Sequence, residues 1–464
     1  NSAENYKSAN CKWDNRSNIP CIEILKSIPN SSNLSISGIN KITITKKQID
    51  EIGAVDIIDV LNTIPDINIT QSGPKGQQAS MFLRGTNSNH TLVMINGIPI
   101  NDQSTTQGLH DFGVDFIQTV QQIEVFPGSS ATHFGSNAIG GAINIIMTGD
   151  FKDNISISGE NISNYELSAN KTITKDESNL NFKIGNVRSK KISAKGNSND
   201  EVDGVVNYTT NINYEKFLKN NFRFHNTVYL RKTKSEYDNS TSNQTDYSGD
   251  NRMGLFQFGL EKLDRNKKQN YNFFYNIYDR EYDERSIIDK YESEVIGVNY
   301  DYSKLINENI SLGFGSQYNY NWGHFDNKGS YQASTKGHFD NLAFYSNIGL
   351  NIFDKSNISL FARSDNHKQT GYNETYKINF EQIFEKFNLG LSAMTGLRNP
   401  TLYEMYGTDN FGYSGNRDLM PEKSNTYELY SNFEINNNFK FSIRGFQSTI
   451  KNNIEYINNK YQND

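Results

Sequence analysis

The amino-acid sequence predicts a mainly β protein: an antiparallel transmembrane β-barrel that follows an N-terminal α+β domain. Composition is the first observation behind this prediction. Aromatic residues make up 12% of the 464 residues, although the mean hydropathy of -0.69 is too low for membrane-spanning helices. In a membrane barrel only every second residue faces lipid, and aromatic rings gather at both interfaces, so a barrel accounts for both values.

Alternation with a period of two is the second observation. In residues 311–322, Leu312, Phe314 and Tyr318 alternate with Ser, Gly, Gln and Asn, and the same period returns in residues 222–230, 427–435 and 439–443. This pattern is typical of strands with one apolar face, here of roughly ten residues each. Polar clusters separate the strands, and the longest cluster, residues 236–251, predicts a long loop. A soluble β-sandwich or a solenoid is the alternative, but sandwiches rarely sustain so many Tyr-rich strands and no repeat period is visible.

The first 150 residues have a different character. Residues 1–40 are polar and predict an extended arm, in which Cys11 and Cys21 form either a disulfide or two unpaired thiols. Residues 41–150 predict a compact α+β domain, and residues 151–464 form the barrel domain. Within the α+β domain we expect short strands over residues 42–44 and 91–95 and a helix over residues 56–62, with the first strand part of the segment KITITKKQI (residues 41–49).

Residues 134–146 read FGSNAIGGAINII, a glycine-rich stretch before an apolar run. A phosphate loop would need Lys and Ser/Thr after the glycines, and a nucleophile turn would need G-x-S-x-G; neither is present. We therefore predict no catalytic residues, and we expect Gly135, Gly140 and Gly141 to allow tight turns before a buried strand over residues 142–146. The net charge of -6 is spread along the chain, which argues against a nucleic-acid partner.

Three blocks of sequence, and the order in which they follow one another, indicate a protein family. They read DVLNTIPDINITQSGPKGQQASMFLRGTNSNHTLVMINGIPIND (residues 59–102), IEVFPGSSATHFGSNAIGGAINIIMTG (residues 123–149), and LRNPTLYEMYG with GNRDLMPEKSNTYELY (residues 397–430). In this order they resemble the TonB-dependent outer-membrane receptors. The resemblance implies a 22-stranded barrel whose lumen holds the α+β domain as a plug. It also implies a location in the bacterial outer membrane, contact with its lipid, and active transport driven by the TonB protein, without catalysis.

The sequence indicates the identity of the ligand less clearly than it indicates the family. Residues 76–101 are most similar to the cobalamin receptors of that family. Siderophore receptors share a looser form of the motif around LRGTNS (residues 83–88) and INGIPI (residues 95–100). Cobalamin or another corrinoid is therefore the expected ligand, with a ferric siderophore or haem as the alternative. A surface structural or adhesive β-protein is the alternative from another class, but it would have no need of a plug. We expect ligand contacts from two plug loops, at Gln77, Gln78, Ser80, Asn101, Gln103, Ser104 and His110; simple loop solvation explains the same composition.

One departure from the family concerns ion pairs between plug and barrel. The family usually has Arg-Gly-Pro where this chain reads Pro127-Gly128-Ser129, so an arginine is missing. We therefore expect Arg84 to make the ionic contact between plug and barrel. The other residues expected there are Glu124 on the plug and Glu404 and Glu422 on the barrel, with solvated surface charges as the alternative.

Two further sites follow from the resemblance. The segment Ile22, Glu23, Ile24 and Leu25 alternates and is the expected TonB-interacting strand, with residues 34–37 as second choice. No cofactor is required, but acidic residues resemble a possible calcium site; they are Asp200, Asp203, Asp238 and Asp246, together with Glu201, Glu236 and Asp250. Acidic loops of this kind are more often only solvated.

The length of the barrel domain gives a last expectation. At roughly 20 residues per strand and connection, residues 151–464 supply about 14 to 16 strands, whereas the family has 22. The chain also ends without a closing strand that finishes in Phe or Trp. We therefore expect a C-terminally truncated chain whose open, curved sheet wraps part-way round the plug.

Overall fold

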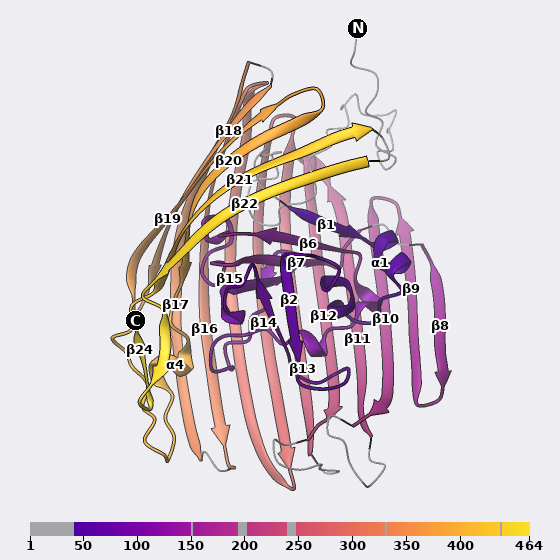
Figure 1. Ribbon diagram of the computed structural model, residues 1–464. Helices are drawn as coiled ribbons and strands as arrows, with labels where there is room; N and C mark the ends of the chain where they lie inside the picture. The colour runs from indigo at the N-terminus through magenta and orange to yellow at the C-terminus, as the bar shows by residue number, and fades with distance from the viewer. Residues whose placement is uncertain are drawn as a thin grey trace.

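The computed structural model describes residues 41–149, 152–193, 202–238, 247–329, 332–353, 355–436 and 439–464. Its largest element is one curved antiparallel sheet of fifteen strands in chain order, with β8 and β22 at its two edges (Figure 1). The strands are β8 (Asn154–Asn161), β9 (Asn164–Lys175), β10 (Ser178–Ile192), β11 (Asp203–Leu218), β12 (Phe222–Glu236), β13 (Tyr247–Asp264), β14 (Lys267–Glu284), β15 (Ile287–Asn307), β16 (Ile310–Asn327), β17 (Ala333–Ile352), β18 (Ser356–His367), β19 (Gly371–Ile383), β20 (Phe387–Arg398), β21 (Glu422–Asn436) and β22 (Phe439–Lys451).

The strand number lies within the expected range, and the sheet is open and curved as expected. Apart from β8, which has 8 residues, the strands of the sheet are longer than the predicted ten residues, up to 21 residues in β15. The predicted long loop over residues 236–251 is too long, because β13 already begins at Tyr247. Long strands suit a tilted crossing of the membrane that continues beyond it at both ends.

The orientation of side chains confirms the barrel type. On β16, Phe314 is 50% exposed on the convex face, whereas Gln317 is only 7% exposed on the concave face. Apolar side chains predominate on the outer face and polar ones on the inner face, the reverse of a soluble sandwich core, and the inner face also carries a few apolar residues, such as Leu255 and Phe274, that pack against the plug. Among the described residues, no helix is long and apolar enough to cross a membrane.

The plug lies against the concave face of this sheet (Figure 1). Its main sheet has the order β1-β6-β7-β4-β5, and β2 pairs with β3 in a second small sheet. The strands are β1 (Ile42–Thr45), β2 (Ile67–Gln71), β3 (Ala79–Leu83), β4 (Thr91–Ile95), β5 (Ile98–Pro99), β6 (Gln122–Pro127) and β7 (Gly141–Ile146). The helices are α1 (Lys46–Ile52), α2 (Ile57–Leu61), α3 (Ala131–Phe134) and the 3₁₀ turns η1 (Ser88–His90), η2 (Phe112–Val114) and η3 (Ile117–Thr119).

Local signals explain these elements. Helix α2 begins because Asp56 accepts a hydrogen bond from the Asp59 backbone amide, and it ends at Leu61 with Asn62 as its C-cap, so the predicted range of residues 56–62 covers the helix and its two caps. The predicted strand over residues 42–44 is confirmed, but the second half of the segment at residues 41–49 is not strand. Thr45 and Gln48 form a capping box, which starts α1 at Lys46.

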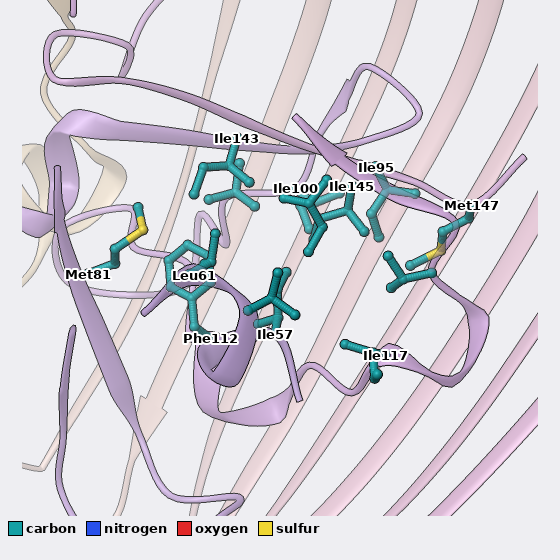
Figure 2. Packing of buried hydrophobic residues seen from close by; sticks show 14 of the residues in the cluster. Ile57, Leu61, Met81, Ile95, Ile100, Phe112, Ile117, Ile143, Ile145 and Met147 are labelled. Atoms are coloured by element: carbon teal, nitrogen blue, oxygen red, sulfur yellow. The ribbon is translucent and has the colours of Figure 1, made fainter. Parts of the chain in front are cut away.

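A compact apolar core holds the plug together. Ile57 and Leu61 of α2 pack with Phe112 and with side chains of the main sheet, such as Ile143 (Figure 2). The glycines before β7 allow close approach, as expected. A Cβ on Gly140 would lie 2.2 Å from the Thr86 hydroxyl, and Gly135 has φ +95.

The remaining elements lie outside the two large units. They are η4 (Lys219–Asn221) in the turn after β11, α4 (Leu402–Tyr406) after β20, and the hairpin of β23 (Ile454–Ile457) and β24 (Lys460–Asn463). An apolar cluster that includes Tyr413 and Leu419 joins the α4 segment to this hairpin through Ile454 and Tyr461.

Candidate functional site at the plug–barrel interface

Arg84 joins the plug to the barrel wall. It follows β3, and its guanidinium lies 2.6 Å from the Glu428 carboxylate on β21 and 2.9 Å from Asp66 of the plug. The side chains of Arg84 and Glu428 are 4% and 1% exposed, so this ion pair is buried. A Cβ on Gly128 would lie 3.1 Å from Arg84 Nη1. Arg84 therefore fills the space beside the position where this chain lacks the family arginine.

A second buried contact uses a histidine of the plug. His90 Nε2 lies 2.7 Å from Glu422 Oε2, and Arg398 Nη1 lies 3.3 Å from the same carboxylate oxygen. The other oxygen of Glu422 accepts a hydrogen bond of 2.7 Å from the Ile454 amide. Glu422 therefore connects the plug, the end of β20 and the β23–β24 hairpin.

Two of the expected interface residues have different partners. Glu404 is buried, but it pairs with Arg398 at 2.5 Å and accepts from the Thr401 amide at 2.8 Å, both within the barrel domain. The reason is local: Glu404 is the third residue of α4 and bends back to complete its capping box. The plug contact of this segment comes instead from the Thr401 hydroxyl, which donates to the Thr106 carbonyl.

Glu124 lies wholly inside the plug. It sits on β6, a central strand, and its carboxylate accepts from Lys41 Nζ at 2.8 Å and from Asn144 Nδ2 at 3.0 Å. Asn144 lies directly opposite Glu124 on the neighbouring strand β7, and Lys41 immediately precedes β1, the neighbour of β6 on its other side, so these partners of Glu124 both belong to the plug.

The loop at residues 72–80 and Asp115 contact strands β11 and β12. Gln77 Nε2 donates to Asp203 and to the Glu236 carbonyl, each at 3.2 Å. Asp115 forms ion pairs with Arg231 of β12 and with His110 of the plug. Burial opposes ionisation of Asp115, but the charges of His110 and Arg231 outweigh it and lower the pKa of this carboxyl below its ordinary value.

The loop at residues 101–111 is held by β14 and β15. Asp102 lies 2.7 Å from Arg280 Nε and accepts a hydrogen bond of 2.8 Å from Ser293. Arg280 also donates to the Ser104 carbonyl at 2.9 Å, and its guanidinium lies 5.0 Å from the centre of the Tyr291 ring. The barrel therefore binds this plug loop through ion pairs and hydrogen bonds.

At the end of the plug, one backbone carbonyl accepts hydrogen bonds from three side chains of the barrel. Met147 O accepts from Lys183 at 2.8 Å, Asn211 at 2.9 Å and Asn213 at 3.1 Å. Lys183 also donates to the Thr119 carbonyl at 3.2 Å. These contacts fix the chain where the plug ends, close to its entry into β8.

Most of the expected ligand-binding residues are buried or already hydrogen-bonded to other parts of the protein. Asn101 is buried, and its side chain bonds to plug backbone at Val93, Thr91 and Gly108. Buried positions are also found for Gln77, Ser104 and His110, half-buried ones for Ser80 and Gln103, and an exposed one for Gln78. The loops therefore serve first as attachments of the plug to the wall, and Gln78 is the member that meets solvent.

Several expected sites fall wholly or partly outside the described residues. These are the arm with Ile22, Glu23, Ile24, Leu25, Cys11 and Cys21, and the acidic residues Asp200, Glu201 and Asp246. Asp203 bonds to Gln77 and Asp238 to Ser193. In the part of the chain that the structure describes, no three His, Cys, Asp or Glu residues are grouped so as to hold a metal ion. The calcium site stays a prediction.

Sequence reasoning missed the partners that the barrel supplies. Glu428, Arg231 and Arg280 were not singled out, nor was His90 on the plug. A signal for Glu428 was present. It lies six residues after Glu422, an even spacing that puts both on the inner face of β21.

Comparison with known proteins agrees with this geometry. Residues 34–142 match the family model described as TonB-dependent Receptor Plug Domain, and residues 149–464 match TonB dependent receptor-like, beta-barrel. The chain belongs to the TonB-dependent receptors. This receptor is 28% identical over 426 residues to Vitamin B12 transporter BtuB from Photobacterium profundum, covering 88% of the chain and 66% of that protein. It thus spans just under two thirds of that relative's length.

Two solved structures show the same fold as this receptor. The siderophore receptor PirA from Acinetobacter baumannii has a TM-score of 0.75 at 16% identity, over 90% of this chain and 71% of PirA. The ferric enterobactin receptor PfeA, in complex with BCV-L6, has a TM-score of 0.77 at 14% identity, over 91% of this chain and 73% of PfeA. At these identities the likeness concerns the fold alone.

Proposed function

We propose that this receptor takes part in TonB-dependent active transport of a scarce ligand across the bacterial outer membrane. The observation that carries the proposal is the set of ion pairs and hydrogen bonds that attach the plug to the barrel wall, such as Arg84 to Glu428 and Asp102 to Arg280. Apolar contact accompanies them, because the core of the plug continues onto wall residues such as Leu255 and Phe274. When the plug leaves the wall, its polar groups regain hydrogen bonds with lumen water, which offsets part of the cost of breaking the polar contacts.

The energy for that movement has to come from outside this chain. Strand addition is the mode of coupling that fits, since main-chain hydrogen bonds supply most of the hold and tolerate loose sequence matches. Ile22, Glu23, Ile24 and Leu25 are the proposed TonB-interacting strand. They precede β1, so a pull on them acts first on the short edge strand of the plug sheet.

The proposed ligand is cobalamin or another corrinoid. Two observations support it: the similarity to a vitamin B12 transporter over most of the chain, and the amide side chains of the two plug loops, which suit a large ligand rich in amides. A ferric siderophore is the second candidate, favoured by the siderophore receptors among the solved structures with this fold. Haem is the third ligand to compare.

Binding measured by quenching of intrinsic fluorescence tests the ligand. The full chain in detergent is titrated with cyanocobalamin, ferric enterobactin and haemin. We expect saturable quenching by cyanocobalamin, weakened by Gln78→Ala in the exposed plug loop and unchanged by Asn309→Ala in an exposed turn at the opposite end of the barrel. Saturable binding of ferric enterobactin alone would transfer the proposal to siderophores. No saturable binding of any of the three would favour the surface structural or adhesive protein.

A further inference from the structure

The outer wall of the sheet carries a cluster of cations that the transport function does not use. We call it the basic patch; its members are Arg188 and Lys190 on β10, Lys232 and Lys234 on β12, and Arg252 on β13. The strand register brings them together. Arg188 lies opposite Val206, which lies opposite Lys234, and Lys232 lies opposite Arg252.

These side chains point away from the lumen. Their neighbours along the strands, Val187, Arg231 and Thr233, are buried against the plug side, so the alternating residues face outward. All five patch residues are exposed. The patch lies at the end of the strands where Asp203 and Glu236 meet the plug loop at residues 72–80.

The basic patch borders the apolar band of the same strands. Going toward the middle of the strands on the outer face, the side chains become Phe182 on β10, Leu230 on β12 and Phe258 on β13, all exposed. Tyr208 stands at the border: it is 55% exposed and lies in register between Asn186 and Lys232. An exposed aromatic ring between apolar and charged rows is typical of the membrane interface.

Carboxylates neutralise only part of this charge. Glu236 pairs with Lys190, and Asp250 pairs with Lys232 and Arg252, each at 3.0 to 3.2 Å. Arg252 also reaches Asp279 on the next strand at 3.1 Å. Arg188 and Lys234 make no ion pair with any residue that the structure describes. Five cations therefore face three carboxylates, and Arg188 and Lys234 are the two cations left over.

We propose that the basic patch binds the phosphate groups of a phosphorylated lipid in the membrane leaflet at this end of the barrel. Acyl chains cover the apolar band, so the groups that meet the next row of side chains are lipid headgroups. Phosphate matches the unpaired cations in charge, and Arg188 can bind it through two N–H groups. Each cation near an anionic membrane surface strengthens binding about 5-fold.

Lipid binding to the full chain in zwitterionic detergent tests the proposal. The probe is a lipid A with two phosphates, compared with the same lipid after removal of both phosphates, and bound lipid is counted by native mass spectrometry. The variant Arg188→Gln/Lys232→Gln/Lys234→Gln removes three charges from the patch. The matched control Lys216→Gln/Lys219→Gln/Lys386→Gln removes three exposed charges at the opposite end of the strands.

We expect the patch variant to bind the phosphorylated lipid about 100-fold more weakly, and the control less than 3-fold more weakly. Neither should change binding of the phosphate-free lipid, which also reports that the barrel surface is intact. Equal weakening in both triple variants would overturn the proposal, as would equal loss of the phosphate-free lipid. The single change Arg188→Gln, at an exposed side chain, should still give a loss of about 5-fold, and no loss there contradicts the proposal. Because the readout is lipid and not ligand, the result is separate from the proposed transport.

Discussion

Replacing Arg84 by Met tests whether a buried ion pair fastens the plug to the barrel. The change removes the guanidinium that lies 2.6 Å from Glu428 and 4.4 Å from the centre of the Phe446 ring. Arg84 has φ +53, a conformation that is strained for any residue with a Cβ. Met has a Cβ too, so the strain is the same in both proteins and cancels from the comparison.

The expected cost follows from what remains around Glu428. Breaking a buried ion pair by removing one partner costs about 3 to 5 kcal/mol. Two features place this case at the lower end: Arg444 still lies 3.6 Å from Glu428, and Asp66, the other partner of Arg84, is partly exposed and can be hydrated. We expect about 3 kcal/mol, which is on the order of a 150-fold larger opening constant for the plug.

Hydrogen exchange of plug peptides covering residues 79–90, followed by mass spectrometry on the full chain, measures this opening. Barrel peptides serve as the internal reference. Lys47→Met is the matched control, because its side chain is 85% exposed and its pair with Glu51 is a surface pair expected to contribute under about 1 kcal/mol. Glu428→Gln combined with Arg84→Met should cost less than the sum of the two single changes. An Arg84→Met effect below about 5-fold, or one equal to that of Lys47→Met, would refute this account of the interface.

Three further changes have definite expected outcomes. Because the pKa of Asp115 is lowered in the folded state, its ionised carboxylate stabilises the protein above the ordinary Asp pKa of about 4, and this contribution is lost as the pH falls through the lowered folded-state pKa. The urea midpoints of wild type and Asp115→Asn should therefore differ at pH 7 and converge as the pH falls below about 4. A constant difference would contradict this. A Cβ at Gly113 would lie 1.9 Å from the Gln77 carbonyl, so Gly113→Ala should destabilise the plug by about 1 to 3 kcal/mol in urea unfolding, whereas Gly445→Ala, with no atom within 4 Å, should be within about 0.5 kcal/mol of wild type. Ile24→Pro should abolish uptake by cells and leave ligand binding intact, because Pro removes a donor needed for strand addition; uptake equal to wild type would place the working segment elsewhere.

Much of the fold was predictable because period-two alternation directly reports a strand with two different faces. The exposed Phe314 and the buried Gln317 of β16 follow from that alternation alone. The end of β1 was not predicted, since no Gly or Pro marks the boundary between Thr45 and Lys46. The capping box of Thr45 and Gln48 decides that boundary, and it becomes visible only when residues three apart are compared.

The interface was predictable on one side only. Arg84 could be chosen from the plug sequence, but its partner Glu428 lies 344 residues later, and nothing local to Arg84 identifies it. The prediction for Glu404 failed for the opposite reason. Glu404 lies in the barrel motif of the family, but its carboxylate bonds to Arg398 and Thr401, which are close to it in the sequence. Pairing between distant charges depends on strand register and plug placement, which composition does not encode.

The same loops that are proposed to meet the ligand also attach the plug to the wall, and this overlap has a mechanical consequence. Gln77 and Ser104 already bond to the barrel, at Asp203 and Arg280, so a ligand that binds their side chains must compete with those hydrogen bonds. Breaking one such hydrogen bond lowers the free energy that holds the plug by about 0.5 to 1.5 kcal/mol, and by up to about 3 kcal/mol where a charged partner is released. The buried contacts that Arg84 and His90 make with β21, at Glu428 and at Glu422 where that strand begins, would remain. Ligand binding at these loops would therefore loosen one side of the plug while the other side stays fixed, and a pull on the N-terminal arm would complete the release.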